Sequence, residues 1–547
     1  MNNKRSRLKS LEVNARKGNI SSSYELYLIY KNGDGVDVDL SLADDYLNFC
    51  FDSISFNFNN GVETPNNRLR VERLDLINFK KFDELSIEFE SDVTVIIGSN
   101  GAGKTTILDG LSRIFSWISA RIIMKKRSGK PLTDFDVKIN SNDTAEVIST
   151  FCLGKKTRYT GSLARASKGI ETNKSSNLDG FNNLSSMYRS LYSDQLNDIS
   201  SSVNIPLLAF YSVDRSHIKS NLSFSPEKIS DSMAYSPLDA IDRSVLDGSG
   251  NIEEFLKWFI ILDNLAEYTS DDKQLSLLKA ELELLATIVT DESSPLWDTF
   301  TEKKTHLEQL TLSDKNSAST KAYKDLQQVK DAIVSAVPSV SDIFVDRSSG
   351  RVEIKIINDK QTINIFQASR GQLVYISLVA DIARRLTELN SNLSVPLHGQ
   401  GIIIIDELEL HLHPEWQQNI VAKLIQTFPN IQFIITTHSP QVLSALPSKK
   451  IRKLGKNKED IDIVSRPLAE SYARSSSDVL ESVMFVNPTP SYPEEKLLKR
   501  YRKIIEQGDI HSRELKDLEQ DLLKALGSNH PELVRLAMVK RRRELLE

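Results

Sequence analysis

Four apolar runs stand out in the hydrophobic pattern of the chain. They lie at Val93–Ile97, Ile205–Arg215, Ile402–Ile405 and Ile431–Thr436. A strand that is apolar along its length, without polar alternation, is typical of a sheet covered on both faces. We therefore predict buried strands in these four places, with Ile402–Ile405 as a central parallel strand of an α/β fold.

Alternation of apolar and polar residues marks a second kind of strand. Leu69–Phe82 and Leu85–Glu90 alternate with a period of two, which predicts an antiparallel pair. Asp342–Ile356 predicts a hairpin with a Ser-Gly turn. Between residues 121 and 235 we expect strand pieces broken by polar loops, because Ser and Asn dominate from Ser162 to Ser202.

Helical spacing occurs at both ends and in the middle of the chain. Residues 15–36 and 39–51 predict two helices joined by a Gly-x-Gly-Val turn, which resembles one tetratricopeptide-like repeat of the Sel type. This repeat is either docked on the rest of the chain or a partner-binding module. Four further helices are predicted at 252–268, 272–290, 297–310 and 320–337. Their apolar spacing does not persist for the three or four heptads of a coiled coil, so we expect a compact helical lobe. Helices rich in charge are predicted for the tail at 493–507, 512–526 and 531–546.

Composition places the chain among soluble globular proteins. It has 547 residues, 40% hydrophobic and 26% charged, with a net charge of −5. The two cysteines, Cys50 and Cys152, are far apart, so neither a disulfide framework nor a CxxC metal site is expected. No apolar run approaches the ~20 residues of a membrane span, and the first residues lack the apolar segment of a signal peptide. We therefore expect a cytoplasmic protein.

A glycine-rich stretch follows the first apolar run directly and precedes a predicted helix. Strand, glycine-rich turn and helix form the context of a phosphate-binding loop, in which backbone N–H groups cradle phosphates at a helix N-terminus. Lys104 would bridge the β- and γ-phosphates, and the Thr105 hydroxyl would coordinate Mg²⁺. The alternative, a glycine-rich turn without a ligand, does not explain the agreement of motif and context. The predicted ATP-binding residues are Gly98, Ser99, Asn100, Gly101, Ala102, Gly103, Lys104, Thr105 and Thr106.

Two acids end the Ile402–Ile405 strand. Asp406 is predicted to hold Mg²⁺, through water or together with Thr105, and Glu407 to polarise the water that attacks the γ-phosphate. Two adjacent acids can also follow a strand by chance. The predicted cofactors are accordingly ATP, as the nucleotide, and Mg²⁺.

The sequence "NFKKF…SIEF…VTVIIGSNGAGKTTILDGL" resembles the ATPase heads of the chromosome-maintenance, RecF and overcoming-lysogenization-defect group. In that group, basic residues after Asn-Phe lie near the nucleotide. The resemblance makes Lys80 and Lys81 candidates, beside the alternative of solvated surface lysines. A strand of related heads ends in a glutamine that senses Mg²⁺ and water. Gln195 lies in a predicted polar loop, so this position has no clear counterpart.

The same resemblance covers the second half of the chain. Ala368-Ser-Arg-Gly-Gln372 resembles the ABC signature motif, with Ala368 in place of leucine. In the family, Ser369, Gly371 and Gln372 would contact the γ-phosphate bound by the opposite subunit. Because the chain carries one set of motifs, the resemblance implies a homodimer or a higher even oligomer.

Histidines follow two of the predicted buried strands, Ile402–Ile405 and Ile431–Thr436. His438 resembles the family's switch histidine, which contacts the γ-phosphate and the attacking water; a core histidine is the alternative. His411 and His413 belong to "DELELHLHP". A metal site here lacks a third ligand in sequence, so a dimer-contact loop is the preferred interpretation.

These patterns predict an ABC-type ATPase head, with a mixed β-sheet and flanking helices, a helical insertion lobe, an N-terminal helical region and a helical tail. The predicted regions are 1–65 (N-terminal helices), 66–250 (first ATPase lobe), 251–340 (helical insertion), 341–450 (second ATPase lobe) and 451–547 (partner-binding tail). The long separation between Lys104 and Asp406 reflects insertions and argues against a transporter head.

The whole combination resembles the ATPase of Septu-type bacterial antiviral defence systems (PtuA), including versions attached to retrons. The resemblance implies an HNH-type nuclease partner, and in retron versions a reverse transcriptase with its RNA–DNA molecule; no nuclease motif or toprim domain is visible in this chain. Basic clusters at 125–130, 449–453 and 540–543 would bind nucleic acid or form solvated surfaces. Two alternatives remain: a RecF-type DNA-repair ATPase, and an ATP-binding scaffold with little turnover.

Overall fold

The structure, a computed structural model, describes residues 2–545 apart from a set of gaps. The gaps are 60, 142, 168, 170–173, 196–202, 219–235, 251, 268–280, 283–284, 286–295, 298, 306–317, 349, 488–491 and 509–510. The chain divides into two compact units, Met1–Val479 and Leu480–Glu547. Among the described helices, none has the length and apolarity needed to cross a membrane.

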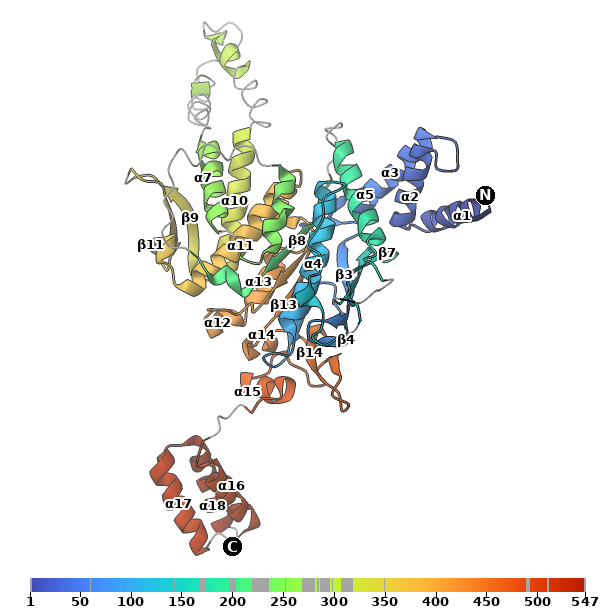
Figure 1. The fold of residues 1–547 in the computed structure, drawn as a ribbon. Helices are drawn as coiled ribbons and strands as arrows, with labels where there is room; N and C mark the ends of the chain where they lie inside the picture. The colour runs from blue at the N-terminus through green and yellow to red at the C-terminus, as the bar shows by residue number, and fades with distance from the viewer. Residues whose placement is uncertain are drawn as a thin grey trace. The chain divides into compact units, whose positions relative to one another are not determined.

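A six-stranded sheet lies at the centre of the first unit (Figure 1). Its order is β15 (Asp462–Ser465), β14 (Ile451–Lys456), β5 (Val93–Ile97), β13 (Ile431–Thr436), β12 (Gly401–Ile405) and β8 (Leu207–Tyr211), with only β15 antiparallel to its neighbour. Every residue of β5, β8, β12 and β13 is buried. The runs are thus confirmed as buried parallel strands, although the strand predicted for Ile205–Arg215 covers only Leu207–Tyr211 and is followed by a 3₁₀ turn at Val213–Ser216. The α/β prediction is correct.

A four-stranded antiparallel sheet accompanies the central sheet. Its order is β4 (Phe82–Glu88), β3 (Leu69–Phe79), β6 (Ala145–Leu153) and β7 (Thr157–Arg165), and β3–β4 is the predicted antiparallel pair. Two buried glutamines join the sheets through their side chains, because Gln400 Oε1 accepts from Leu69 N (2.9 Å) and Gln432 Oε1 accepts from Val71 N (2.9 Å). Helix α4 (Lys104–Ile123) contacts strands of both sheets.

A helix replaces part of the polar loop expected between Ser162 and Ser202. Helix α5 spans Asp179–Gln195 and packs on α4 and β7. Its Ser- and Asn-rich composition hides a helical spacing of buried residues: Phe181, Leu184, Met187, Tyr188 and Leu191. Gln195 is therefore the last residue of a helix and does not follow a strand of the sheet.

The N-terminal region holds three helices and a hairpin: α1 (Asn2–Arg16), α2 (Ile20–Asn32), α3 (Leu40–Ile54), β1 (Phe56–Asn59) and β2 (Val62–Pro65). Helix α1, which has few apolar residues, was not predicted. Helices α2 and α3 pack on α5, and the Tyr24 hydroxyl lies 2.9 Å from Ser190 Oγ. The region is thus docked on the rest of the unit, one of the two predicted alternatives.

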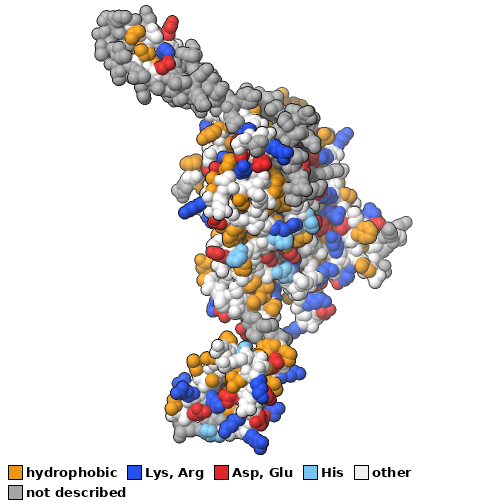
Figure 2. Space-filling model, turned by 90° about the vertical axis from the view of Figure 1, so that its left-hand side faces the viewer, with side chains coloured by type: hydrophobic (Ala, Val, Ile, Leu, Met, Phe, Trp, Pro, Cys, Tyr) orange, Lys and Arg blue, Asp and Glu red, His pale blue; other side chains and the backbone are white. Residues whose placement is uncertain are grey.

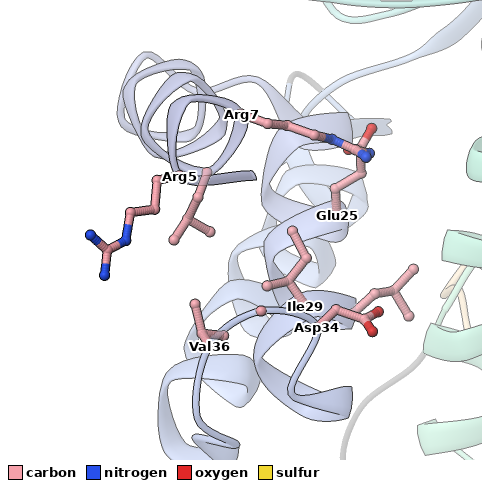
Figure 3. A pocket seen from close by; sticks show the side chains of 9 residues that line it. Arg5, Arg7, Glu25, Ile29, Asp34 and Val36 are labelled. Atoms are coloured by element: carbon pink, nitrogen blue, oxygen red, sulfur yellow. The ribbon is translucent and has the colours of Figure 1, made fainter. Parts of the chain in front are cut away.

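A pocket of about 360 Å³ opens beside α1 and α2. Arg7 reaches across it toward Glu25, and their ion pair measures 3.0 Å, whereas Arg5 points away from Glu25 (Figure 3). Ile29 and Val36 supply apolar lining. The pocket therefore belongs to the packing of the N-terminal helices.

Helices α7 (Ile252–Glu267) and α10 (Ala318–Ala336) pack on each other and on α11 (Arg370–Leu389). They agree with the first and last of the four predicted lobe helices. Most of 272–290 lies outside the described residues, and the described part of 297–310, residues 297 and 299–305, is helical as predicted. A three-stranded sheet of β9 (Val340–Asp346), β10 (Glu353–Asn358) and β11 (Gln361–Asn364) follows. The predicted 342–356 hairpin is correct and gains a third strand.

The end predicted for the head at residue 450 is too early. Strand β14 pairs with β5, and the unit continues through β15 to α15 (Ser476–Val479), which packs on α14 (Pro440–Ser444). The prediction failed because β14 is rich in charge. Arg452 is 3% exposed and pairs with Glu90 (2.6 Å), and Lys450 pairs with Asp92 (2.6 Å), so both side chains of this basic cluster have internal partners.

The second unit contains the three helices predicted for the tail: α16 (Glu495–Gln507), α17 (Arg513–Leu526) and α18 (Pro531–Glu544). They enclose a small core of Leu498, Tyr501, Ile505, Leu515, Leu518, Leu522, Leu533 and Leu536. The unit thus has its own hydrophobic core.

Candidate nucleotide site

The glycine-rich loop joins the end of β5 to the start of α4. Gly101 and Gly103 have φ of +76° and +101°, a region that favours glycine. A Cβ at Gly103 would lie 2.3 Å from the Phe82 ring, whereas a Cβ at Gly101 would meet nothing within 4 Å. The two glycines therefore allow a left-handed turn at the N-terminus of α4, the end of a helix that favours anions.

The side chain of Lys104 folds back onto the backbone of this loop. Its Nζ donates to the carbonyls of Gly98 (3.0 Å) and Ser99 (3.3 Å), and the residue is only 7% exposed. Burial lowers the pKa of Lys104, while the carboxylates of Asp406, Glu407 and Glu409 act in the opposite direction. A phosphate anion at the loop would favour the charged form of this lysine.

The hydroxyl of Thr105 donates to Oδ2 of Asp406 at 3.0 Å. Oδ1 of Asp406 accepts from the Thr436 hydroxyl, whose oxygen in turn accepts from Glu407 N at 2.8 Å. The ends of β5, β12 and β13 thus bring together the hydroxyl and the carboxylate that the sequence predicts as Mg²⁺ ligands.

Arg215 is a residue of this site that the sequence did not reveal. It follows β8 in the 3₁₀ turn Val213–Ser216 and is 3% exposed. Its Nη1 donates to the carbonyls of Ser212 (2.8 Å) and Asp406 (2.6 Å), and its Nη2 to that of Glu407 (2.6 Å). Burial lowers its pKa to about 10. Glu407 has a φ of +47°, and Arg215 stabilises this backbone conformation by binding the carbonyls of Asp406 and Glu407.

His438 directly follows Thr437 at the end of β13. Its backbone N–H donates to Glu409 Oε1 at 2.5 Å, and the Thr437 hydroxyl donates to Glu409 Oε2 at 2.8 Å. Glu409 thereby fixes the loop that carries His438. The sequence contained this acid in "DELELHLHP" but gave it no role.

Lys80 and Lys81 both have partners beside the loop. Lys81 Nζ donates to the carbonyls of Gly101 (3.1 Å) and Ala102 (3.0 Å). Lys80 forms an ion pair of 2.7 Å with Asp109 in α4. Both lysines therefore lie next to the loop, and neither is only a solvated surface residue.

The signature-like residues form the start of α11. Ser369 caps the helix: its Oγ accepts from Gln372 N (3.3 Å), and the side-chain Oε1 of Gln372 accepts from Ser369 N (3.1 Å). A Cβ at Gly371 would lie 2.2 Å from the carbonyl oxygen of His411. These residues share a pocket of about 830 Å³ with His411, His413 and Trp416. None of the residues 98–106, all of which the structure describes, lines this pocket.

The remaining predictions concern histidines and a glutamine. One face of the first unit carries histidines close together (Figure 2). Within the described part of the chain, however, no group of three His, Cys, Asp or Glu side chains suits a metal ion. His413 instead caps α12 (Pro414–Gln417), which precedes α13 (Ile420–Thr427). The segment after β8, Ser212–Ser216, contains no glutamine.

Comparison with known proteins identifies the domain that this site belongs to. A family model for the AAA ATPase domain, AAA_15, matches residues 70–443, which is more than half of the chain. The chain belongs to this ATPase family. The matched AAA_15 region includes the phosphate-binding loop, the start of α11, Asp406, Glu407 and His438.

Relatives of this AAA_15 protein extend the match to the whole chain. The Retron Ec83 probable ATPase of Escherichia coli is 30% identical over 97% of this chain and 96% of the relative. The Retron Vc95 probable ATPase of Vibrio cholerae serotype O1 biovar El Tor is 29% identical over 92% and 95%. The Septu protein PtuA of Bacillus mycoides (strain KBAB4) is 29% identical over 37% of this chain and 28% of the relative. Among solved structures, a Smc head domain from Pyrococcus furiosus, bound to the C-terminal domain of ScpA, matches with 16% identity and a TM-score of 0.36, covering 73% of this chain and 96% of that chain.

Proposed function

We propose that this AAA_15 protein binds ATP at residues 98–106 and hydrolyses it with Mg²⁺. The observation that carries the proposal is the 3.0 Å hydrogen bond from Thr105 Oγ1 to Asp406 Oδ2. Thr105 lies at the start of α4, after β5, and Asp406 directly follows β12; their hydroxyl and carboxylate oxygens are the ligand types that Mg²⁺ prefers. The donor set therefore fits the ion, and Thr105 and Asp406 are its proposed ligands. When bound, Mg²⁺ neutralises charge on the phosphates.

Three further residues have roles in the proposed reaction. Lys104 would exchange the carbonyls of Gly98 and Ser99 for phosphate oxygens. Glu407, held at the end of β12 by Arg215, would orient the attacking water and accept its proton. His438 would donate a hydrogen bond to the γ-phosphate from the end of the neighbouring strand.

Two copies of the chain would complete each site. Ser369, Gly371 and Gln372 lie in a pocket that contains none of the residues 98–106. A pocket at the N-terminus of a long helix offers N–H groups to an anion. We therefore propose that these three residues contact the γ-phosphate of ATP bound by a second copy, so that ATP stabilises a homodimer or a higher even oligomer.

The relatives suggest where such a switch is used. Their names assign them to retrons and to Septu. We infer that this chain is the ATPase subunit of a bacterial antiphage defence complex in the cytoplasm. In that complex, ATP-dependent dimerisation would control an HNH-type nuclease partner, together with a reverse transcriptase and its RNA–DNA molecule in a retron setting.

Phosphate release by the purified protein tests the chemistry. With ATP and Mg²⁺, the wild type should turn over, and Glu407→Gln should bind ATP but turn over at least about 100-fold more slowly. Lys104→Ala should lose ATP binding. An equal rate in wild type and Glu407→Gln would remove Glu407 from the reaction, and full ATP affinity in Lys104→Ala would refute the site.

A scaffold with slow turnover is the second candidate. Two observations favour it: the segment after β8 contains no glutamine, and Ser369 and Gln372 bond to each other. In that case the wild type would bind ATP and dimerise without releasing phosphate. The experiment above separates the two functions.

A further inference from the structure

A basic pocket lies at the end of β3 that is remote from the nucleotide site. Arg68 directly precedes this strand and Arg70 is its second residue, so their side chains leave the same face. Lys80 follows the other end of the strand. Because β3 has 11 residues that each rise about 3.3 Å, the two ends are roughly 35 Å apart. The pocket is therefore separate from residues 98–106.

Four basic residues line this pocket, which has a volume of about 670 Å³. Arg68 and Arg70 are half-buried, while Lys155 and Lys156 lie exposed in the turn between β6 and β7. A volume of this size accommodates a small ligand or one segment of a larger one.

Three buried nitrogen atoms of the two arginines lack partners. Among the described residues, nothing accepts a hydrogen bond from Nε or Nη2 of Arg68 or from Nε of Arg70, although all three atoms are buried. Buried polar groups in folded proteins normally have partners, and an unpaired one is costly. An external acceptor would satisfy these donors.

Two acids close to the arginines in sequence or charge interaction each pair with another cation. Glu72, two residues after Arg70, accepts from Arg158 at 2.6 and 2.9 Å. Asp92 pairs with Lys450 at 2.6 Å. Burial, followed by the charge of Arg70, lowers the pKa of Arg68 to about 10, and the charge of Asp92 opposes this shift only in part. The positive charge of the pocket is thus only partly balanced by these acids.

The N-terminal helices close one side of the pocket. Gly18 and Phe49 belong to its lining. The turn before α2 is tied to the β6–β7 turn, since Lys156 Nζ donates to Lys17 O at 2.8 Å and Asn19 Nδ2 donates to Lys156 O at 3.3 Å. The docked helices therefore help to build a site that the ATPase sheet alone would leave open.

We propose that this pocket binds a phosphate group, with Arg68 and Arg70 contacting the phosphate oxygens. The planar guanidinium matches phosphate with two parallel hydrogen bonds, and burial strengthens them. Lys155 and Lys156 attract the anion at the rim. The phosphate comes either from the backbone of a nucleic-acid strand or from a free mononucleotide or inorganic phosphate.

Binding experiments on the full-length protein without ATP test the proposal. The pocket variant is Arg68→Ala/Arg70→Ala. The control, Arg73→Ala/Arg165→Ala, removes two arginines of the same sheet that are paired with Asp75 and Asp134. The probes are a fluorescein-labelled single-stranded DNA, followed by anisotropy at several salt concentrations, and AMP and inorganic phosphate, followed by calorimetry.

For a nucleic-acid ligand, the pocket variant should bind the DNA at least about tenfold more weakly, and its salt slope should fall by roughly two. The control should match the wild type. For a small ligand, the pocket variant should bind DNA as the wild type does, or neither protein should bind it. Calorimetry with AMP or phosphate should then show one binding site fewer in the pocket variant than in the wild type and the control. Any binding at residues 98–106 should remain in all three proteins, because it does not depend on these arginines. Wild-type binding of all three probes by a pocket variant with an unchanged melting temperature would overturn the proposal.

Discussion

The carboxylate of Glu409 joins the loop after β12 to the loop after β13, since its Oε1 accepts from the backbone N–H of His438 at 2.5 Å. Its Oε2 accepts from the Thr437 hydroxyl at 2.8 Å. Glu409 lies two residues after Glu407, so one side chain relates the proposed base to the proposed phosphate-binding histidine. A residue in this position fixes the geometry of the reaction without touching ATP.

Glu409→Ala should therefore slow catalysis more than it weakens ATP binding. We expect phosphate release to fall by about 10- to 100-fold, because the loop that carries His438 loses both hydrogen bonds. ATP affinity should stay close to that of the wild type. Glu415→Ala, which removes an exposed acid of α12, is the matched control. An equal loss of ATP affinity and rate would show that Glu409 supports the fold and not the reaction.

Arg215 should stabilise the protein as well as the site. Arg215→Ala removes the guanidinium donors from the carbonyls of Ser212, Asp406 and Glu407, of which those of Ser212 and Glu407 keep a backbone donor. This loss should lower the free energy of unfolding of the first unit by roughly 3 kcal/mol. Urea denaturation followed by tryptophan fluorescence measures this change. Arg466→Ala, with an arginine that is 57% exposed, should cost under about 1 kcal/mol. Similar values for both variants would contradict the role of Arg215.

The glycines of the phosphate-binding loop provide a matched pair of variants. A Cβ at Gly103 would lie 2.3 Å from the Phe82 ring at φ of +101°, so Gly103→Ala must displace the aromatic ring or the loop. Gly101→Ala meets no atom within 4 Å and carries only the cost of φ at +76°, about 1 kcal/mol. Equilibrium ATP binding should therefore be lost in Gly103→Ala and retained, though weakened, in Gly101→Ala. Equal affinities would show that the Phe82 contact does not shape the loop.

The sequence was most informative where one property dominates a segment. The run at Val93–Ile97 is β-branched throughout and the run at Ile402–Ile405 is apolar throughout, so they predicted buried strands, and the residues that follow them were found together. It failed where composition opposed structure. Strand β14 carries three basic residues, and the Ser- and Asn-rich segment of α5 concealed its apolar face.

Contacts between segments that are distant in sequence could not be predicted from the sequence. Arg215 precedes Asp406 by nearly 200 residues, and only the pairing of β8 with β12 brings its guanidinium to the carbonyls of Asp406 and Glu407. The same holds for the pocket around Arg68, because the β6–β7 turn and the N-terminal helices come from separate predicted regions. Local patterns indicate strands and helices, whereas such contacts depend on strand order.

His398 provides a prediction about pH. Its Nδ1 accepts a hydrogen bond from the backbone N–H of Glu63 at 3.1 Å, which requires the neutral ring. Burial lowers the pKa of His398 below its usual 6.5, and the carboxylate of Glu63 opposes this shift only in part. The unfolded chain therefore takes up a proton at a higher pH than the folded chain does. Stability from this group is present above about pH 6.5 and is lost as the pH falls toward the folded pKa.

His398→Asn isolates this effect, because an asparagine carbonyl can accept the same bond without titrating. The free energy of unfolding, measured by urea denaturation from about pH 8 to about pH 5, should fall more steeply for the wild type than for His398→Asn. Below about pH 6.5 the variant should become more stable relative to the wild type, because only the wild type must break the bond to Glu63 when its side chain is protonated. Parallel curves across this range would mean that His398 binds protons equally in the folded and unfolded chains, and that the contact between β2 and the turn at His398 does not depend on its charge.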